Sequence, residues 1–426
     1  MPVKAGFCEV DITPEVGIRK IGWLKDVVST KVLDPLHARA AVFESGSGSV
    51  AFVQLDLLSV TGTLTAQIRR AIAERHGFPG ENVMVAATHN HAGPAVCSFG
   101  DVPQDRPYAE WLIGRVVEAF GRALEVRQTV QLGWGGVFEF DIAHNRRVVM
   151  RDGTVRTHGS WNDPDCLRVE GPIDPVVTVL AARCPAGDLA GCLVNFACHP
   201  THHGDDGVLS AGYPGVLAAE MKRHGCPVTL FLNGAFGNIG TSDACRDHQD
   251  PGMERAGTAL AGDATRAIEQ MAWHDDVELG CESATIELPF RQVDEDQVHG
   301  TARGAQRFID PAIYDRNMDA LLAKIRTEGT QAAEVQAIRI GQCCFVSIPA
   351  EYFVEHGLRI KEDSFPARAI VVGAANGMVG YVPTREAFER GGYEATFGGG
   401  SRLAAEAGDM LAEAAIGLVQ RSGAGR

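Results

Sequence analysis

Residues 83–91 read VMVAATHNH, an unbroken apolar run that ends in a His-x-His pair. Such a short run of Val, Met and Ala predicts a strand that is buried on both faces. On an extended strand, side chains two residues apart point to the same side, so we expect His89 and His91 to project together beyond the strand's end. Two imidazoles placed in this way indicate a metal site. The alternative is a pair of structural histidines held by hydrogen bonds.

Similar apolar runs recur along the chain, and each is followed by a turn or a polar cluster. They predict further strands at residues 50–53, 176–181, 193–197, 228–232, 344–348 and 370–372. Amphipathic patterns predict helices at residues 65–74, 108–126, 214–224, 254–273 and 313–327. Polar and apolar residues alternate over 130–142 and 277–290, which is typical of antiparallel strands.

Together these patterns predict an α/β or α+β fold, in which mixed β-sheets are covered by helices. The metal site would lie at the C-terminal ends of strands and in the loops that follow them. Nothing in the sequence forces a division, so we expect residues 1–426 to form a single catalytic domain. It would end in a helix at about 401–419 and a frayed tail at 421–426.

The composition excludes several classes of function. The formal net charge is −15 and clusters of Lys and Arg are absent, which argues against nucleic acid as a partner and against electrostatic binding to an anionic membrane. No apolar stretch reaches the roughly 18 residues of a membrane span, and the N-terminus lacks the apolar core of a secretory signal. We therefore expect no stable membrane anchor.

The cysteines favour a cytoplasmic location. There are eleven of them, without a Cys-x-x-Cys repeat. Cys192, Cys198, Cys343 and Cys344 lie within apolar runs, which predicts small core residues rather than metal ligands. Free thiols of this kind fit a reducing compartment.

A second candidate ligand is His199, which comes soon after the apolar run 193–197. Ligands in α/β folds bind where strands end and loops begin, so His199 is well placed. His202 and His203 follow closely and are alternative ligands for the ion. An exposed polar loop is the simpler interpretation of these two histidines.

Glu351 is the candidate acidic ligand, because it follows the apolar run 344–348 and Pro349. A buried carboxylate is costly unless it is paired or bound to a metal. The alternative is that Glu351 begins an exposed helix over residues 352–357. Farther along, a Gly-rich segment at 374–386, followed by residues 391–394, has the composition of a compact site wall.

Five segments, in this order along the chain, resemble motifs of the neutral/alkaline, non-lysosomal ceramidase family. They are Thr88-His89-Asn90-His91-Ala92-Gly93-Pro94, Asn145-Arg146-Arg147, Asn195-Phe196-Ala197-Cys198-His199, Pro349-Ala350-Glu351, and Tyr381-Val382-Pro383-Thr384-Arg385-Glu386 with Tyr393. Residues 10–14 and 35–40 resemble the N-terminal motifs of the same family. The resemblance spans nearly the whole chain, which looks like a short, soluble homologue of the catalytic domain alone.

This resemblance implies a zinc-dependent amidohydrolase with one Zn²⁺ per chain. The implied metal ligands are His89, His199, Glu351 and Tyr381. It further implies that His91 acts as the acid/base and that Arg146 and Tyr393 contact the reacting group, where they would stabilise the oxyanion. Arg147 is an equally plausible contact. A metal-activated water would attack the amide carbon.

The chain also departs from the family pattern. It ends soon after Tyr393, without the additional immunoglobulin-like domain of the ceramidases, and residues 210–215 and 233–238 stand where the family has acidic loop residues. We therefore expect a small-molecule linear amide substrate, smaller and more soluble than ceramide. The alternatives are a zinc-dependent esterase or lactonase, since activated water attacks any acyl carbon, and a non-catalytic binding protein on the same fold.

Overall fold

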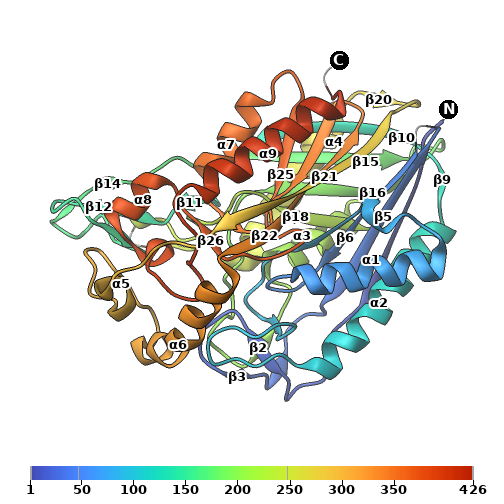
Figure 1. Cartoon of the computed structure of the whole chain (residues 1–426). Coiled ribbons are helices and arrows are strands. Elements are labelled where there is room, and N and C mark those ends of the chain that lie inside the picture. Colours follow the sequence, from blue (N-terminus) through green and yellow to red (C-terminus); the bar gives the residue numbers. More distant parts are fainter. Residues whose placement is uncertain (1, 47, 247, 425–426) are drawn as a thin grey trace.

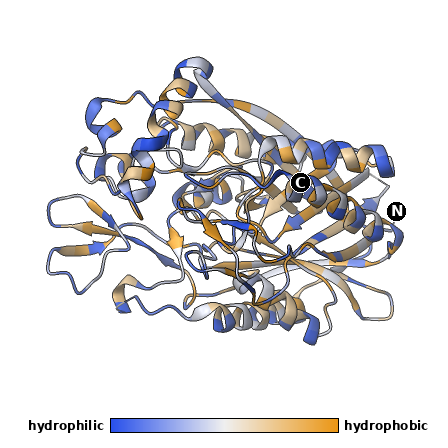
Figure 2. Cartoon of the chain, turned by 90° about the horizontal axis from the view of Figure 1, so that it is seen from below, coloured by the Kyte–Doolittle hydropathy of each residue, from blue (hydrophilic) through white to orange (hydrophobic). Residues whose placement is uncertain are grey.

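Three β-sheets surround a common core, and each carries helices on its outer face (Figure 1). The structure is a computed structural model that describes residues 2–46, 48–246 and 248–424. Figure 2 shows hydrophobic colour concentrated on the central strands, while the covering helices mix hydrophobic and hydrophilic residues. The predicted architecture of mixed sheets covered by helices is confirmed.

The first sheet has the strand order β7-β6-β5-β1-β9. Its strands are β1 (Lys4–Asp11), β5 (His37–Ser45), β6 (Gly48–Leu55), β7 (Val83–Ala87) and β9 (Gln128–Thr129). Only β6 and β7 pair in parallel. The helices α1 (Gly62–His76) and α2 (Arg106–Glu125) pack on its outer face.

The second sheet has the order β18-β16-β15-β10-β20. Its strands are β10 (Gln131–Phe138), β15 (Val176–Arg183), β16 (Leu189–Phe196), β18 (Thr229–Asn233) and β20 (Trp273–His274). Here β16 and β18 form the parallel pair. The helices α3 (Gly212–Arg223) and α4 (Gly252–Gln270) cover its outer face.

The third sheet has the order β21-β22-β23-β25. Its strands are β21 (Leu279–Pro289), β22 (Thr330–Ile340), β23 (Cys343–Ser347) and β25 (Arg368–Val372). Again one pair, β23 and β25, is parallel. The helices α7 (Val354–Asp363) and α9 (Ala407–Ser422) pack outside it.

Alternate side chains of each sheet enter two different cores. In β5, Ala41 and Phe43 face the core shared by the three sheets, while Ala40 and Val42 face α1 and α2. Strands that are covered on both faces, such as β7 and β23, are buried throughout, as their uninterrupted apolar runs predict, whereas β21 alternates between partly buried and exposed positions. Burying this much apolar surface is the main driving force for the fold.

Shorter elements close the ends of the sheets. The strands are β2 (Arg19–Ile21), β3 (Val27–Val28), β4 (Lys31–Val32), β8 (Gly93–Pro94), β11 (His144–Asn145), β12 (Arg147–Met150), β13 (Val155–Thr157), β14 (Cys166–Val169), β17 (Val208–Leu209), β19 (Ile239–Gly240), β24 (Glu351–Tyr352) and β26 (Tyr381–Val382). The helices are α5 (Glu295–His299), α6 (Pro311–Glu328) and α8 (Arg385–Arg390).

Several predicted boundaries were wrong. The helix expected over 254–273 ends at Gln270, because residues 273–274 pair with β10 as β20. The C-terminal helix expected at 401–419 runs from Ala407 to Ser422. Arg421 and Ser422 of the predicted frayed tail are therefore helical, while residues 425–426 lie outside the described part. Among the described helices, none combines the length and the apolar character needed to span a bilayer.

Candidate metal centre

Three strand ends, one from each main sheet, position the candidate ligands. His89 comes soon after β7, His199 soon after β16, and Glu351 soon after β23. Backbone hydrogen bonds join the first and third of these ends through the segment after β25, since Ala87 donates to the carbonyl of Ala374 at 3.1 Å and Ala374 donates to the carbonyl of Ala350 at 3.2 Å. Residues far apart in the sequence therefore meet at one point, as the metal site predicted at strand ends requires.

The His-x-His pair does not continue the strand, contrary to the sequence prediction. β7 ends at Ala87, and His89 has a left-handed φ of 67°. This turn is held by backbone hydrogen bonding, because the N–H of His89 donates to the carbonyl of Leu57 at 2.9 Å. The two rings still lie together, with centroids of His89 and His91 separated by 5.0 Å. A turn, and not strand alternation, brings them to the same place.

Backbone carbonyls fix the tautomers of two histidines. Nδ1 of His89 lies 2.8 Å from the carbonyl oxygen of Leu58, and Nδ1 of His199 lies 2.8 Å from that of Phe236. A carbonyl oxygen only accepts, so Nδ1 carries the proton in both rings and Nε2 presents a lone pair. Burial, reinforced by Arg146, lowers the pKa of His199 to about 4, which keeps this ring neutral at pH 7.

These lone pairs converge on a carboxylate. Oε2 of Glu351 lies 3.4 Å from Nε2 of His89 and 3.1 Å from Nε2 of His199. Three electron-pair donors this close repel one another unless a cation or a proton lies between them. Nitrogen and carboxylate oxygen are ligands that zinc accepts, so the donor set fits a divalent metal.

His91 is a third imidazole at this point. Potential ligand atoms of His89, His91 and His199 lie within 4.8 Å of one another. Both ring nitrogens of His91 are buried without a hydrogen-bond partner among the described residues. Burial, together with the other two histidines, lowers the pKa of His91 well below its usual value. A neutral, unpartnered imidazole of this kind is available either to bind the ion or to accept a proton.

Glu351 and Tyr381 lie side by side because β24 and β26 pair in parallel. Glu351 therefore begins a short buried strand, and the alternative of an exposed helix start is wrong. The Tyr381 ring stacks on His199 with centroids 6.4 Å apart. Burial and then Glu351 raise the pKa of the Tyr381 phenol well above its usual value. Its hydroxyl is also 3.1 Å from a guanidinium nitrogen of Arg146.

Glu394 anchors both arginines of the Asn145-Arg146-Arg147 motif. Its carboxylate accepts from Arg146 and from Arg147, each at 2.8 Å, and from the hydroxyl of Thr157 at 2.7 Å. Burial opposes ionisation, but the two guanidinium groups outweigh it and lower the pKa of Glu394 to about 2. Arg147 is fixed elsewhere as well, since it donates to Glu170 and to the carbonyl of Gly391.

Sequence reasoning assigned no role to Glu394. Its one signal was its position directly after Tyr393 in a Gly-rich segment, but its partners lie more than 200 residues away. The two arginines differ in their contacts: a guanidinium nitrogen of Arg146 lies 3.1 Å from the Tyr381 hydroxyl, whereas the guanidinium of Arg147 packs 5.2 Å from the Phe353 ring.

The two other histidines of the loop after β16 are engaged elsewhere. Nδ1 of His203 lies 2.8 Å from the carboxylate of Asp206. His202 packs edge-on against Tyr213, with ring centroids 6.1 Å apart. The buried ammonium of Lys20 donates to the carbonyls of His203 and Asp206, both at 2.6 Å, and clamps this loop. Of the three candidates, His199 is the one beside Glu351.

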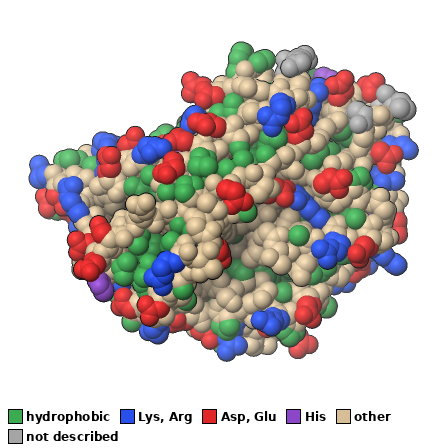
Figure 3. Space-filling view, in the orientation of Figure 1, with side chains coloured by type: hydrophobic (Ala, Val, Ile, Leu, Met, Phe, Trp, Pro, Cys, Tyr) green, Lys and Arg blue, Asp and Glu red, His purple; other side chains and the backbone are tan. Residues whose placement is uncertain are grey.

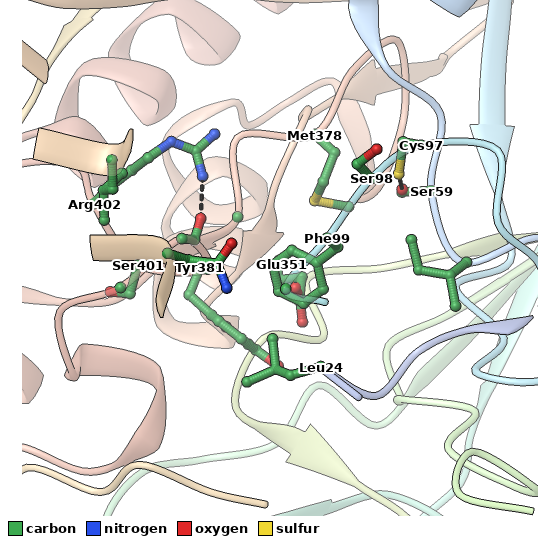
Figure 4. Close-up of a pocket in the computed structure, with 18 of the residues that line it drawn as sticks. Leu24, Ser59, Cys97, Ser98, Phe99, Glu351, Met378, Tyr381, Ser401 and Arg402 are labelled. Carbon is green, nitrogen blue, oxygen red and sulfur yellow. Dashed lines mark hydrogen bonds between the residues drawn. The ribbon is translucent and has the colours of Figure 1, made fainter. Parts of the chain in front are cut away.

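A cavity of about 620 Å³ opens onto this centre, and Figure 3 shows the corresponding face hollowed near its middle. His89, Glu351, Tyr381 and Tyr393 line its inner end. In Figure 4, Glu351 and Tyr381 lie in the middle of the view, with Met378 and Ser98 on one side and Arg402 on the other. Apolar wall residues are Ile21, Leu24, Leu58, Phe99, Ile313, Met318 and Leu321.

Comparisons with known proteins show a similar sequence and a similar fold. No protein-family model matches the chain. The chain is 26% identical to neutral ceramidase from Pseudomonas aeruginosa over 213 residues, which are 47% of this chain and 30% of that protein's length. A crystal structure of neutral ceramidase from Pseudomonas aeruginosa superposes with a TM-score of 0.74 and 19% identity, over 99% of this chain and 75% of that one.

A structure described as ceramidase complexed with C2 gives a TM-score of 0.73 at 20% identity, over 99% of this chain and 76% of that one. The sequence match and the shared fold confirm the predicted resemblance. The chain resembles neutral ceramidase in sequence over about half of its length and has the neutral ceramidase fold.

Proposed function

We propose that this protein is a zinc-dependent hydrolase that cleaves the carbon–nitrogen bond of an amide. The observation that carries the proposal is the meeting of two Nε2 lone pairs, from His89 and His199, at one carboxylate oxygen of Glu351. Such a cluster of donors is stable only around a positive charge. The relative with a matching sequence is a neutral ceramidase, which supports an amide as the bond that is cleaved.

His89, His199 and Glu351 would hold the ion, with Tyr381 as a fourth ligand. Tyr381 lies beside Glu351 through the parallel pairing of β24 and β26. Its raised pKa means that the phenol is protonated until a cation and Arg146 favour the ionised form. A bound zinc ion polarises a carbonyl and lowers the pKa of a bound water to about 7.

His91 is suited to moving a proton at the reacting centre. Its two nitrogens have no partner among the described residues, and its ring is neutral, so it accepts a proton from water and returns it to the departing amine. The half-buried Trp23 packs edge-on against His91, with ring centroids 5.7 Å apart, and holds the ring.

Arg146 and Tyr393 would stabilise the negative charge that develops on the amide oxygen. The guanidinium of Arg146 is ionised, because Tyr381 and Glu394 raise its pKa against the effect of burial. Tyr393 lines the cavity, and its ring lies 5.5 Å from that of Tyr381. Fixed donors in a site shielded from water stabilise an oxyanion more strongly than water does.

The size of the cavity supports a small amide. About 620 Å³ lies within the range of roughly 300–1,000 Å³ that is usual for sites of small molecules. We therefore retain the proposal of a linear amide that is smaller than ceramide. A cytoplasmic location also stays a proposal, and the free state of all eleven cysteines supports it.

The direct test compares matched amides and esters of the same short acyl chains before and after chelation. We expect amide hydrolysis that is lost on removal of the metal and restored by Zn²⁺, with kcat/KM measured for each substrate. Hydrolysis of esters alone would replace the amidase proposal with the esterase alternative. Activity that survives complete chelation would exclude a metal-dependent reaction.

A further inference from the structure

Two cations line the cavity at a distance from the metal centre, and their surroundings differ. Lys324, on α6, is 43% exposed and pairs with Glu328 at 3.7 Å. Arg402 lies in the segment after β26, beside the Gly-rich residues 398–400 that also line the cavity. Glu351 is the carboxylate among the described lining residues, and it belongs to the metal centre.

Arg402 meets neutral acceptors in place of an acid. Its Nε donates to the amide oxygen of Gln331 at 2.9 Å, and Nη1 donates to the carbonyl of Gly399. A guanidinium has five N–H donors, so the remaining ones stay available to the cavity. Within the residues that the structure describes, no carboxylate makes an ion pair with Arg402. Burial lowers its pKa to about 10, against a weaker opposing effect of Glu328, so it remains charged at neutral pH.

The two arginines beside the metal centre show what Arg402 lacks, whereas Arg291, which also donates to neutral acceptors on Ala395 and Ser401, is not among the described residues that line the cavity. Arg146 and Arg147 share the carboxylate of Glu394, and Arg147 also contacts Glu170. Arg402 is a partly buried cation, and a cation without an anionic partner attracts one. The planar fork of arginine matches the two oxygens of a carboxylate. The partner of Arg402 is therefore expected to come with the substrate.

We propose that Arg402 binds a carboxylate of the substrate. The enzyme would then act on amides that carry an anionic group remote from the bond that is cleaved. This inference rests on the proposed amidase function and adds the class of substrate to it. Arg402, Glu351, Leu24 and Phe99 line the same cavity, and in Figure 4 Phe99 and Leu24 lie near Glu351 while Arg402 lies at the other side of the view. The substrate would place its amide at the metal centre, its chain against these apolar residues and its carboxylate at Arg402.

The test uses pairs of short linear amides that differ only at the end remote from the amide bond. One member of each pair carries a carboxylate there and the other a hydroxymethyl group. Separate pairs place this group on the acyl half and on the amine half. For the wild-type protein we expect kcat/KM to favour the carboxylate by about 10- to 100-fold, the range for a hydrogen bond to a charged group. Arg402→Gln should abolish this preference while changing kcat/KM on the hydroxymethyl amide by less than about 3-fold.

Two further variants control for charge and for folding. Arg402→Lys should restore part of the preference, because it keeps the charge and loses the planar fork. Arg385→Gln removes an exposed arginine that pairs with Asp409 outside the cavity, and it should leave the preference unchanged. A preference that persists in Arg402→Gln, or that is absent from the wild type, would overturn the inference. A stronger preference for a matched phosphonate would overturn the assignment to carboxylate.

If the protein is not an amidase, the same experiment gives a different result. If the wild type cleaves neither amide of a pair, the amidase proposal fails, and binding of the uncleavable ketone isosteres then decides the inference. Calorimetric titration should show the carboxylate ketone binding the wild-type protein at least about 10-fold more tightly than the hydroxymethyl ketone, with the difference lost in Arg402→Gln. Equal binding of the two ketones would overturn the role of Arg402.

Discussion

The metal centre and the cavity wall are built in opposite ways. The centre consists of buried side chains that backbone carbonyls hold at the ends of strands from three sheets, as with His199 and the carbonyl of Phe236. The wall comes from α6 and from loops, and its side chains include partly exposed ones such as Leu321 and Lys324. If the protein has the proposed function, its chemistry is fixed by the core of the fold, whereas its choice of substrate is set by loops and a helix in which substitutions cost little stability.

The largest expected effect comes from neutralising the carboxylate of the centre. Glu351→Gln keeps the size of the side chain but removes the negative charge between His89 and His199. We expect kcat/KM and metal affinity each to fall by more than about 100-fold, because even outer-shell partners of metal sites contribute 10- to 100-fold. Activity assays and metal titration measure both. Glu362→Gln, at an exposed position of α7, is the matched control and should behave as the wild type.

The next largest effect is expected at His91 and tests whether this residue carries a proton or binds the metal. His91→Ala should reduce kcat by about 10²- to 10⁴-fold, the usual contribution of an acid/base group, while the metal content stays unchanged. Elemental analysis of the purified variant, combined with single-substrate kinetics, gives both values. Loss of the ion together with activity would show instead that His89, His91 and His199 form the ligand set.

Glu394 holds Arg146 beside the metal centre, and we also expect it to stabilise the folded protein. Glu394→Gln leaves the buried guanidinium groups of Arg146 and Arg147 without their shared carboxylate, and we expect a loss of about 3–5 kcal/mol in the free energy of unfolding at pH 7. Denaturant unfolding measures this loss, and the exposed Glu389→Gln is the control.

The pH dependence of this loss follows from the pKa of Glu394, which is about 2 in the folded protein. In the unfolded chain a Glu titrates near about 4.3. Since the folded-state pKa is depressed, the carboxylate contributes fully above about pH 4.3, and its contribution is lost as the pH falls toward 2. The stability difference between wild type and Glu394→Gln should narrow over this window. A constant difference would contradict the proposed pairing.

The smallest effect is expected from a substitution in the wall of the cavity. Leu321→Ala shortens a partly exposed side chain of α6 that lines the cavity. We expect KM to rise by no more than about 10-fold, as for the loss of a few methylene groups from an apolar contact, with kcat and metal content unchanged. A large fall in kcat would show that the wall and the centre are not separable.

The sequence predicted the sheets better than the turns between them. Runs such as 83–87 and 344–348 are apolar throughout because both faces of their strands are covered, and this pattern is visible in a single sequence. The left-handed turn at His89 was missed, since the positive φ falls on a histidine and not on a glycine, which marks such turns most clearly. The resemblance, and not the pattern, indicated His199 as the proposed ligand among the three histidines after β16.

Charge pairs between residues far apart in the sequence could not be predicted from the sequence either. In the sequence, Glu394 and Arg402 are both charged residues of a Gly-rich segment. In the structure, Glu394 pairs with arginines, whereas Arg402 lines the cavity. Only the packing of distant segments decides between these environments, and single-sequence patterns carry no information on it.

The central claim is that side chains from three sheets bind one divalent ion, and elemental analysis of the purified protein tests it most directly. We predict about one zinc per chain in the wild type, and none in the protein with both His89→Ala and His199→Ala, which should remain folded by circular dichroism. Absence of stoichiometric metal from the wild type after purification with zinc, or undiminished zinc in the doubly substituted protein, would contradict it.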